Sequence, residues 1–380
     1  MVKKNICDSR LVHLDLIRGL AALAVCAEHL RAYLFTGYRH LAGSVGLFGK
    51  LFYFATGLGH QAVMLFFVLS GYFVGGSVIK SLAENRWSWA GFARRRLTRL
   101  YMVLIPALVL TAFWDGLGHA LTAGRGYDGI FGNLYHSGPQ SGLPARDGSA
   151  VFLGNALYLQ TILVPVYGSN GPLWSLAYEF WYYLTFPLAM LALAPGNSWR
   201  YRAVHLLLLV ACGCLLPWPV WEGAVIWLMG CAVFWISRHS RLGEPCGRKW
   251  VCVCGGLVLL ASLALSRGDS LGGYDLLIGL GFASMLPCLI RRNTASRLYG
   301  LVAIGLSDIS YTLYVVHFPL LSFLFFTFRP GRQVAPSPAA YGTFLLLLCG
   351  VVAYASLLWW LFERRTDDVR RIIERRFRFS

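Results

Sequence analysis

The sequence predicts an all-α fold: a polytopic bundle of about ten transmembrane helices with both termini in the cytoplasm. Of the 380 residues, 57% are hydrophobic and only 13% are charged, and the mean hydropathy is +0.57. Soluble domains carry about 25% charged residues. Because a chain this apolar exceeds what one aqueous core can bury, residues 1–380 form one expected membrane domain with no separate soluble domain. Helices are expected over 15–362, followed by a basic cytoplasmic tail over 363–380.

Ten stretches are apolar enough to cross a bilayer, which takes about 20 mostly apolar residues. They cover residues 15–35, 57–79, 101–122, 173–194, 202–218, 220–237, 250–266, 272–290, 304–328 and 341–362. An eleventh apolar stretch, 152–166, is short and lies beside a loop rich in Gly and Pro. The longest polar stretch is 124–150, which contains Tyr127, Asp128, His136, Arg146 and Asp147.

The charges of the loops decide whether 152–166 crosses the membrane. Cytoplasmic loops of membrane proteins retain an excess of Lys and Arg. If this segment does not cross, the loops and tail downstream of it place 16 Lys and Arg in the cytoplasm and three outside. If it crosses, that ratio inverts. The charges therefore favour ten spans, with 152–166 as a partial or re-entrant helix.

The net charge of +17, from 34 Lys and Arg against 17 Asp and Glu, does not indicate a nucleic-acid partner. Basic membrane proteins acquire the same balance from their cytoplasmic loops, and no nucleic-acid-binding motif accompanies it. The ten cysteines include no C-x-x-C pair. The close pairs Cys212/Cys214 and Cys252/Cys254 lie in apolar runs, so we expect small buried hydrophobes and no disulfide framework or metal site.

The N-terminus resembles a signal peptide only in part. Lys3 and Lys4 precede an apolar run, as in a secretory signal. However, Asp15 and Arg18 interrupt that run, and it continues past Ala24. We therefore expect a retained first transmembrane helix.

The first helix carries four polar residues that a bilayer disfavours: Asp15, Arg18, Glu28 and His29. A charged side chain at the centre of a membrane helix costs about 2.5–3.5 kcal/mol on insertion scales. Asp15 and Arg18 are neighbours at i,i+3 and are expected to pair. Arg18 and His29 are eleven residues apart, which is three turns plus about 20° and roughly 16 Å along the axis. They share a face, which favours a functional pair over a snorkelling Arg and an isolated core His.

Two further polar clusters lie in apolar surroundings. Ser70, within the run 66–72, forms a small polar step in the second helix, which a helix-packing notch explains equally well. Arg95, Arg96 and Arg99 open the third helix, where ordinary topological anchoring is the alternative.

Two more clusters are expected towards the outer side. Trp174, Ser175 and Glu179 begin the helix at 173–194, and a glutamate one turn into a span is costly unless it is paired or close to water. The second cluster is Ser310-Tyr311-x-x-Tyr314-x-x-His317. Residues 310, 314 and 317 share a helix face, which predicts a line of hydrogen-bonding groups that could be functional or purely structural.

These clusters, in this order, resemble the family-3 integral membrane acyltransferases, and the resemblance runs from Leu14 to Glu363. It is carried by five blocks: Leu14-Asp15-x-x-Arg18-Gly19 with His29, Phe66-Phe67-x-x-Ser70-Gly71, Arg95-Arg96-x-x-Arg99, Trp174-Ser175-Leu176 with Glu179, and Ser310-Tyr311 with Tyr314 and His317. The chain departs from the family at Met102, where Pro is frequent, at Met64, where an acidic residue is frequent, and at Glu363-Arg364-Arg365, where the family has Glu-x-Pro.

The resemblance implies a multi-pass enzyme of the bacterial inner membrane that moves an acyl group, most often acetyl, from cytoplasmic acyl-CoA to a hydroxyl of a carbohydrate or envelope glycan. His29 is the expected catalytic base or covalent acyl carrier, with Glu179 as a second catalytic residue. Arg18, Arg95, Arg96 and Arg99 are expected to contact the phosphates of CoA.

The remaining candidates are supporting residues on the acceptor side: Asp15, Ser70, Trp174, Ser175, Tyr311, Tyr314 and His317. Acyl-CoA is expected as a substrate, with no permanently bound cofactor and no metal. The expected partners are acyl-CoA, a carbohydrate or glycolipid acceptor and the lipid bilayer; homo-oligomerisation is left open. The rival interpretation is a transporter or channel with an intramembrane Arg/His/Glu site.

The loop charges give a direct test of topology. A reporter fused after Ser380 should behave as cytoplasmic, and one inserted into 124–150 should behave as external. A C-terminal reporter on the outside would mean that 152–166 crosses the membrane.

Overall fold

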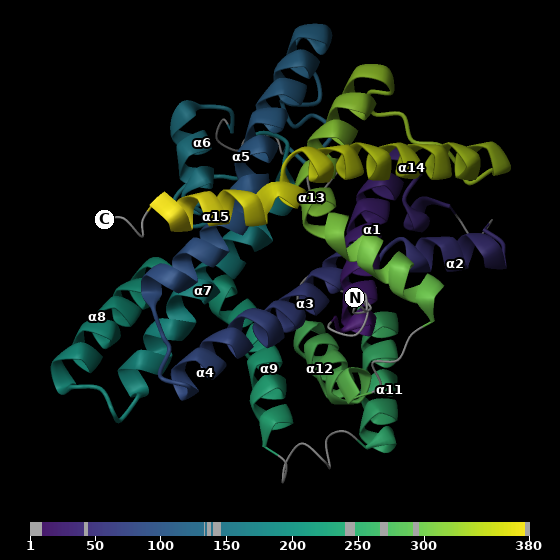
Figure 1. The fold of residues 1–380 in the computed structure, drawn as a ribbon. Helices are drawn as coiled ribbons and strands as arrows, with labels where there is room; N and C mark the ends of the chain where they lie inside the picture. The colour runs from purple at the N-terminus through teal and green to yellow at the C-terminus, as the bar shows by residue number, and fades with distance from the viewer. Residues whose placement is uncertain are drawn as a thin grey trace, which may run out of the picture. The chain divides into compact units, whose positions relative to one another are not determined.

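The computed structural model describes residues 10–41, 45–132, 134, 138–139, 146–239, 248–266, 273–291 and 296–376. It is 79% helix, and no strand occurs within those ranges (Figure 1). Of the residues singled out in the sequence, Lys3, Lys4, His136 and the tail from residue 377 lie outside the described ranges.

Each of the ten predicted stretches corresponds to a helix (Figure 1). The single helices are α1 (Val12–Leu34), α5 (Trp89–Thr122), α7 (Trp174–Leu193), α8 (Trp199–Leu215), α9 (Trp218–Arg238), α11 (Lys249–Leu265), α12 (Asp275–Arg291), α13 (Arg297–Phe328) and α14 (Pro338–Leu361). The stretch 57–79 corresponds to α3 (Gly59–Ser70), the π-helical turn η3 (Gly71–Gly75) and α4 (Gly76–Ala83). The shorter elements are η2 (Tyr38–His40), α2 (Leu47–Ala55), α6 (Ser149–Ala156), η4 (Gly171–Leu173), η5 (Glu363–Arg365) and α15 (Thr366–Arg376).

Five described stretches are both long and apolar enough to span a membrane. They are Leu47–Ala83, Trp89–Thr122, Trp218–Arg238, Arg297–Phe328 and Pro338–Arg376. The other predicted spans depart from that standard for visible reasons. The helices α8, α11 and α12 have 17 residues each, or about 26 Å, and α1 carries the charged residues discussed above. The chain is therefore an integral membrane protein, while the count of ten spans remains a prediction.

The segment 152–166 does not form a continuous helix. The helix α6 ends at Ala156 after eight residues, which is about 12 Å, too short to cross a bilayer. In its last turn, the buried Asn155 donates to the carbonyls of Val151 and Pro165, both at 2.9 Å, and accepts from the backbone N–H of Tyr167 at 3.0 Å. The Asn155 side chain thus satisfies two backbone carbonyls and one backbone N–H at the point where the chain reverses direction after α6.

The chain divides into two compact units. The first comprises Met1–Arg18, Gln61–Trp87 and Ser175–Ile304, and the second comprises Gly19–His60, Ser88–Trp174 and Gly305–Ser380.

Small residues allow close helix packing in the first unit. A Cβ on Gly71, in the π-helical turn, would overlap the carbonyl oxygen of Trp227 on α9. Next to it, Ser70 accepts the indole N–H of Trp227 at 3.1 Å and shares a hydrogen bond with Tyr183 at 3.2 Å. The polar step at Ser70 therefore has the contacts of a packing notch.

The second unit has an aromatic core between α1 and α13. Tyr33 stacks on Phe325 with ring centroids 5.2 Å apart, and its hydroxyl bonds to that of Ser322 at 2.8 Å. A Cβ on Gly19 would overlap the side chain of Leu306. Gly19 therefore allows the two helices to approach closely, which places the inner face of α1 against α13.

The cysteine expectation is correct only in part. The eight described cysteines are all free. Cys26, Cys212, Cys231 and Cys288 are buried, but Cys214, Cys254 and Cys349 are exposed. The prediction that both members of each close pair are buried is wrong, because residues two apart on a helix point about 200° apart around its axis.

A proline in α13 creates a polar defect that a loop residue repairs. Pro319 has no N–H, so the carbonyl of Val315, one turn earlier, lacks its helical donor. The fully buried side chain of Asn170 donates to that carbonyl at 2.9 Å and to the Thr111 hydroxyl on α5 at 3.2 Å. The loop before α7 is thereby attached to both helices.

This repair predicts a specific coupling in stability. Asn170→Ala should destabilise the protein, because a buried carbonyl without a donor costs about 1–3 kcal/mol. In a Pro319→Ala background the helix supplies its own N–H, so the same substitution should cost roughly 1 kcal/mol less. Thermal unfolding of the four variants in one detergent measures the difference. Because the Thr111 contact is lost in both backgrounds, equal losses would show that Asn170 does not act through Val315.

Candidate functional site

Two histidines from helices far apart in the sequence meet in the second unit. Nδ1 of His29 on α1 lies 2.9 Å from Nε2 of His317 on α13. The two rings are nearly parallel, with centroids 5.2 Å apart and an interplanar angle of 15°. Phe318 packs its edge against the His29 ring at 4.9 Å. His317 is fully buried, whereas His29 is half-buried.

The backbone fixes which nitrogen carries each proton. Nδ1 of His317 lies 2.8 Å from the carbonyl oxygen of Leu313. A carbonyl only accepts, so this Nδ1 is protonated, and in neutral His317 the Nε2 is an acceptor. His29 must therefore donate its Nδ1 proton to His317. Its own Nε2 is left with a lone pair.

This chain of three groups is suited to general base catalysis. A proton taken up at Nε2 of His29 places positive charge on a ring whose Nδ1–H already points at an acceptor. His317 is held in turn by the Leu313 carbonyl, as a third group holds the base in a nucleophile–base–orienter arrangement. Within the part of the chain that the structure describes, a neutral imidazole and a backbone carbonyl lie behind His29, in the position that a carboxylate takes in a Ser-His-Asp triad.

Aromatic and polar groups lie around the same helices. The Tyr314 hydroxyl donates to the carbonyl of Pro172 at 3.0 Å. Trp174 stacks on His60 with centroids 6.3 Å apart and an interplanar angle of 21°. The backbone N–H of His60 donates to the Glu28 carboxylate at 3.1 Å. His60 is exposed and Trp174 is half-buried, so the pair offers an accessible aromatic surface.

Several residues here were not assigned roles from the sequence. Glu28 was noted only as a costly charge, His60 carries no motif, and His317 was placed on the acceptor side and not against His29. Arg31 was also missed, although it lies two residues after His29. Its Nε donates to the Thr56 carbonyl at 3.1 Å, and its guanidinium lies over the Tyr53 ring at 5.4 Å.

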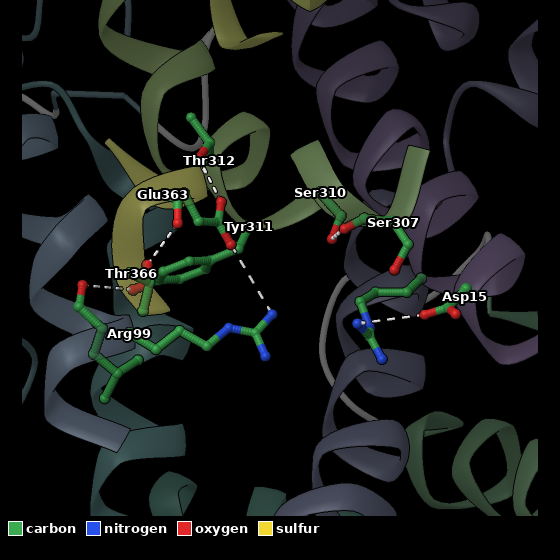
Figure 2. A network of polar contacts seen from close by, with 10 residues as sticks. Asp15, Arg99, Ser307, Ser310, Tyr311, Thr312, Glu363 and Thr366 are labelled. Carbon is green, nitrogen blue, oxygen red and sulfur yellow. Dashed lines mark hydrogen bonds and ion pairs between the residues drawn. The ribbon is translucent and has the colours of Figure 1, made fainter. Parts of the chain in front are cut away.

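The hydrogen-bonding groups predicted along α13 bond to partners on several different segments. The Ser310 hydroxyl donates to the Ser307 carbonyl of its own helix at 2.7 Å. Tyr311 donates instead to the Leu100 carbonyl on α5 at 3.2 Å (Figure 2). Tyr314 and His317 bond to Pro172 and His29, as described above. The shared face thus joins α13 to two other segments, η4 and α1, and Tyr311 on a different face joins it to α5.

The basic cluster at the start of α5 belongs to the same unit as His29. Arg95 and Arg99 are exposed, and Arg96 is half-buried with its guanidinium 5.7 Å from the centre of the Phe92 ring. Arg99 forms an ion pair with Glu363 at 4.0 Å (Figure 2). Exposed arginines of this kind are available to an anionic ligand.

The remaining candidates lie in the first unit: Asp15, Arg18, Ser70, Ser175 and Glu179. The predicted pair of Asp15 and Arg18 is confirmed, at 3.7 Å (Figure 2), and Arg18 also lies over the Phe73 ring at 5.1 Å. Ser175 is buried and Glu179 half-buried on α7. A role for Glu179 and Arg18 together with His29 stays a prediction.

Comparisons with known proteins agree with the resemblance seen in the sequence. The profile of the family-3 acyltransferase domain matches residues 11–363. Acyltransferase MdmB of Streptomyces mycarofaciens is 33% identical over 181 residues, which are 47% of this chain and 39% of that relative. No solved structure matches the chain significantly. The match extends from α1, which carries His29, to Glu363 and so includes every element of the site described above. The chain belongs to the family-3 acyltransferases.

Proposed function

We propose that this membrane acyltransferase moves an acetyl group from cytoplasmic acetyl-CoA to a hydroxyl of a carbohydrate or envelope glycan at the outer side of the inner membrane. The observation that carries the proposal is the chain from Leu313 through His317 to His29, which leaves Nε2 of His29 as a base.

In the proposed reaction, Nε2 of His29 removes the proton of the acceptor hydroxyl as its oxygen attacks the thioester carbonyl. The C–S bond breaks, and the imidazolium returns its proton to the leaving CoA thiolate. A covalent route, in which Nε2 first takes the acyl group, uses the same lone pair. Both routes require the tautomer that His317 imposes.

The donor and the acceptor would use different parts of the site. Arg95, Arg96 and Arg99 have the charge and fork geometry that phosphate recognition needs. Trp174 and His60 provide stacking faces of the kind that a sugar ring uses. The family to which the chain belongs supports an enzyme over the transporter interpretation.

The first test is of the two histidines. His29→Ala should abolish acyl transfer while leaving expression and membrane insertion intact. His317→Leu should lower kcat by up to roughly 10⁴-fold, as when the group that orients the histidine of a catalytic triad is replaced and the histidine takes the wrong tautomer. The kcat of His317→Gln should lie between those of the wild type and His317→Leu, because a glutamine carbonyl can still accept the Nδ1–H of His29.

CoA release by purified protein measures these rates. His239→Ala is the matched control: this exposed histidine on the other unit bonds the Trp235 carbonyl at 2.8 Å and should be dispensable. Normal acylation by well-inserted His29→Ala protein would remove the catalytic assignment.

The second test is of the donor site. Neutralising Arg95 or Arg99 should raise the KM for acetyl-CoA about 10- to 100-fold, because a charge-assisted hydrogen bond contributes roughly 1.5–3 kcal/mol. The KM of the acceptor should change little. Added salt should reproduce part of the effect at these exposed contacts.

Arg200→Ala provides the control, since Arg200 is exposed and lies over the Trp199 ring at 5.6 Å. An unchanged KM for acetyl-CoA in correctly inserted Arg95→Ala and Arg99→Ala proteins contradicts the donor-site assignment.

A further inference from the structure

Glu363 is a buried carboxylate that joins three helical elements. It begins η5, directly after α14, and its side chain is only 9% exposed. Its Oε2 accepts the Thr312 hydroxyl of α13 at 2.6 Å, and its Oε1 lies 4.0 Å from Nη2 of Arg99 on α5 (Figure 2). Glutamate is almost never fully buried unless it is paired, and here Thr312 and Arg99 are its partners.

The two interactions of Glu363 differ in tightness. The contact with Thr312 is a short O–H···O⁻ hydrogen bond that fixes the carboxylate against α13. The contact with Arg99 is longer than the 2.7–2.9 Å of a charge-assisted N–H···O bond, and the Arg99 side chain is 49% exposed. At 4.0 Å, Glu363 attracts the guanidinium without a hydrogen bond, so it does not occupy the five N–H donors of Arg99.

A second contact holds the same turn of α5. The Tyr311 hydroxyl donates to the carbonyl of Leu100 at 3.2 Å, and residue 100 follows Arg99 directly. Two consecutive residues of α13 thus contact α5. Tyr311 bonds the backbone of Leu100 directly, and Thr312 holds Glu363, which in turn pairs with the side chain of Arg99. One contact therefore holds the backbone next to Arg99, and the other attracts the guanidinium at the end of its side chain.

We propose that Glu363 is a positioning residue for donor binding, which holds the Arg99 guanidinium in the orientation that receives a phosphate of acyl-CoA. This inference rests on the proposed function of Arg99. A flexible arginine loses rotamer freedom when it binds, at a cost that pre-orientation reduces. Glu363 touches neither the thioester nor the acceptor, so it acts on donor affinity and not on the chemical step.

The test is the kinetics of Glu363→Gln. Glutamine keeps the shape and can still accept from Thr312 but loses the charge that orients Arg99. The KM for acetyl-CoA should rise about 3- to 10-fold, which corresponds to the loss of pre-orientation of one side chain. The acceptor KM and kcat should change less than twofold. An unchanged or lowered donor KM overturns the proposal.

A double-mutant cycle separates this proposal from the proposed function. If Glu363 acts through Arg99, Arg99→Ala/Glu363→Gln should have the same donor KM as Arg99→Ala alone. If Arg99→Ala itself leaves the donor KM unchanged, the proposed donor site is wrong. If Arg99→Ala raises it and Glu363→Gln adds its full effect on top, the donor site stands and the positioning role fails.

Two further comparisons guard against a general folding defect. Thr312→Val should raise the donor KM in the same direction and Thr312→Ser should restore it, which decides the question even if Glu363→Gln fails to insert. Asp367→Asn removes one carboxylate from an exposed pair with Arg370, at 3.1 Å, on the adjacent helix α15. It should leave the donor KM unchanged, and a rise equal to that of Glu363→Gln would contradict the specific role of Glu363.

Discussion

The carbonyl oxygen of Leu313 is the fixed point of the site. A backbone carbonyl cannot donate a proton, so its contact with His317 sets the tautomer of that ring, and His317 sets the tautomer of His29. No side chain needs to be charged for this to hold. Neutral groups avoid a large cost in an apolar bundle, where a buried charge without a partner is strongly unfavourable. These two contacts thus orient a ring nitrogen with a free lone pair, which is the base that we propose, and they use only neutral groups and a helix backbone.

The helix that provides this carbonyl also organises much of the second unit. Inside a membrane every backbone polar group needs a partner, and Pro319 leaves the Val315 carbonyl without one. Asn170 fills that place and ties the loop before α7 to α13 and α5. On the turns before it, Tyr311 and Thr312 reach α5 and Glu363. The same helix therefore connects α1, the loop before α7 and the turn of α5 that carries Arg99.

The helices themselves were accessible from sequence, because apolar length is a strong signal. All ten predicted stretches are helical, and the Asp15–Arg18 pair follows from spacing within one helix. The contact between His29 and His317 could not be predicted, because it joins positions 288 residues apart and depends on how α1 packs on α13. The sequence shows Glu363 only as part of a departure from a family motif, and its contacts with Thr312 and Arg99 become visible only in the fold. Helical periodicity assigns residues to faces, but it does not say which face meets which.

The central claim is that Nε2 of His29 carries the lone pair while Nδ1 carries the proton. Nitrogen-15 NMR of histidine-labelled protein in lipid bilayers, with the His29 signals identified by their loss in His29→Gln, measures this directly. We expect a protonated Nδ1 and an unprotonated Nε2 on His29 at neutral pH, and the exchange of these two states in His317→Leu. A His29 ring protonated at Nε2 in the wild-type protein would contradict the account, because its free nitrogen would then face His317 and not the substrate.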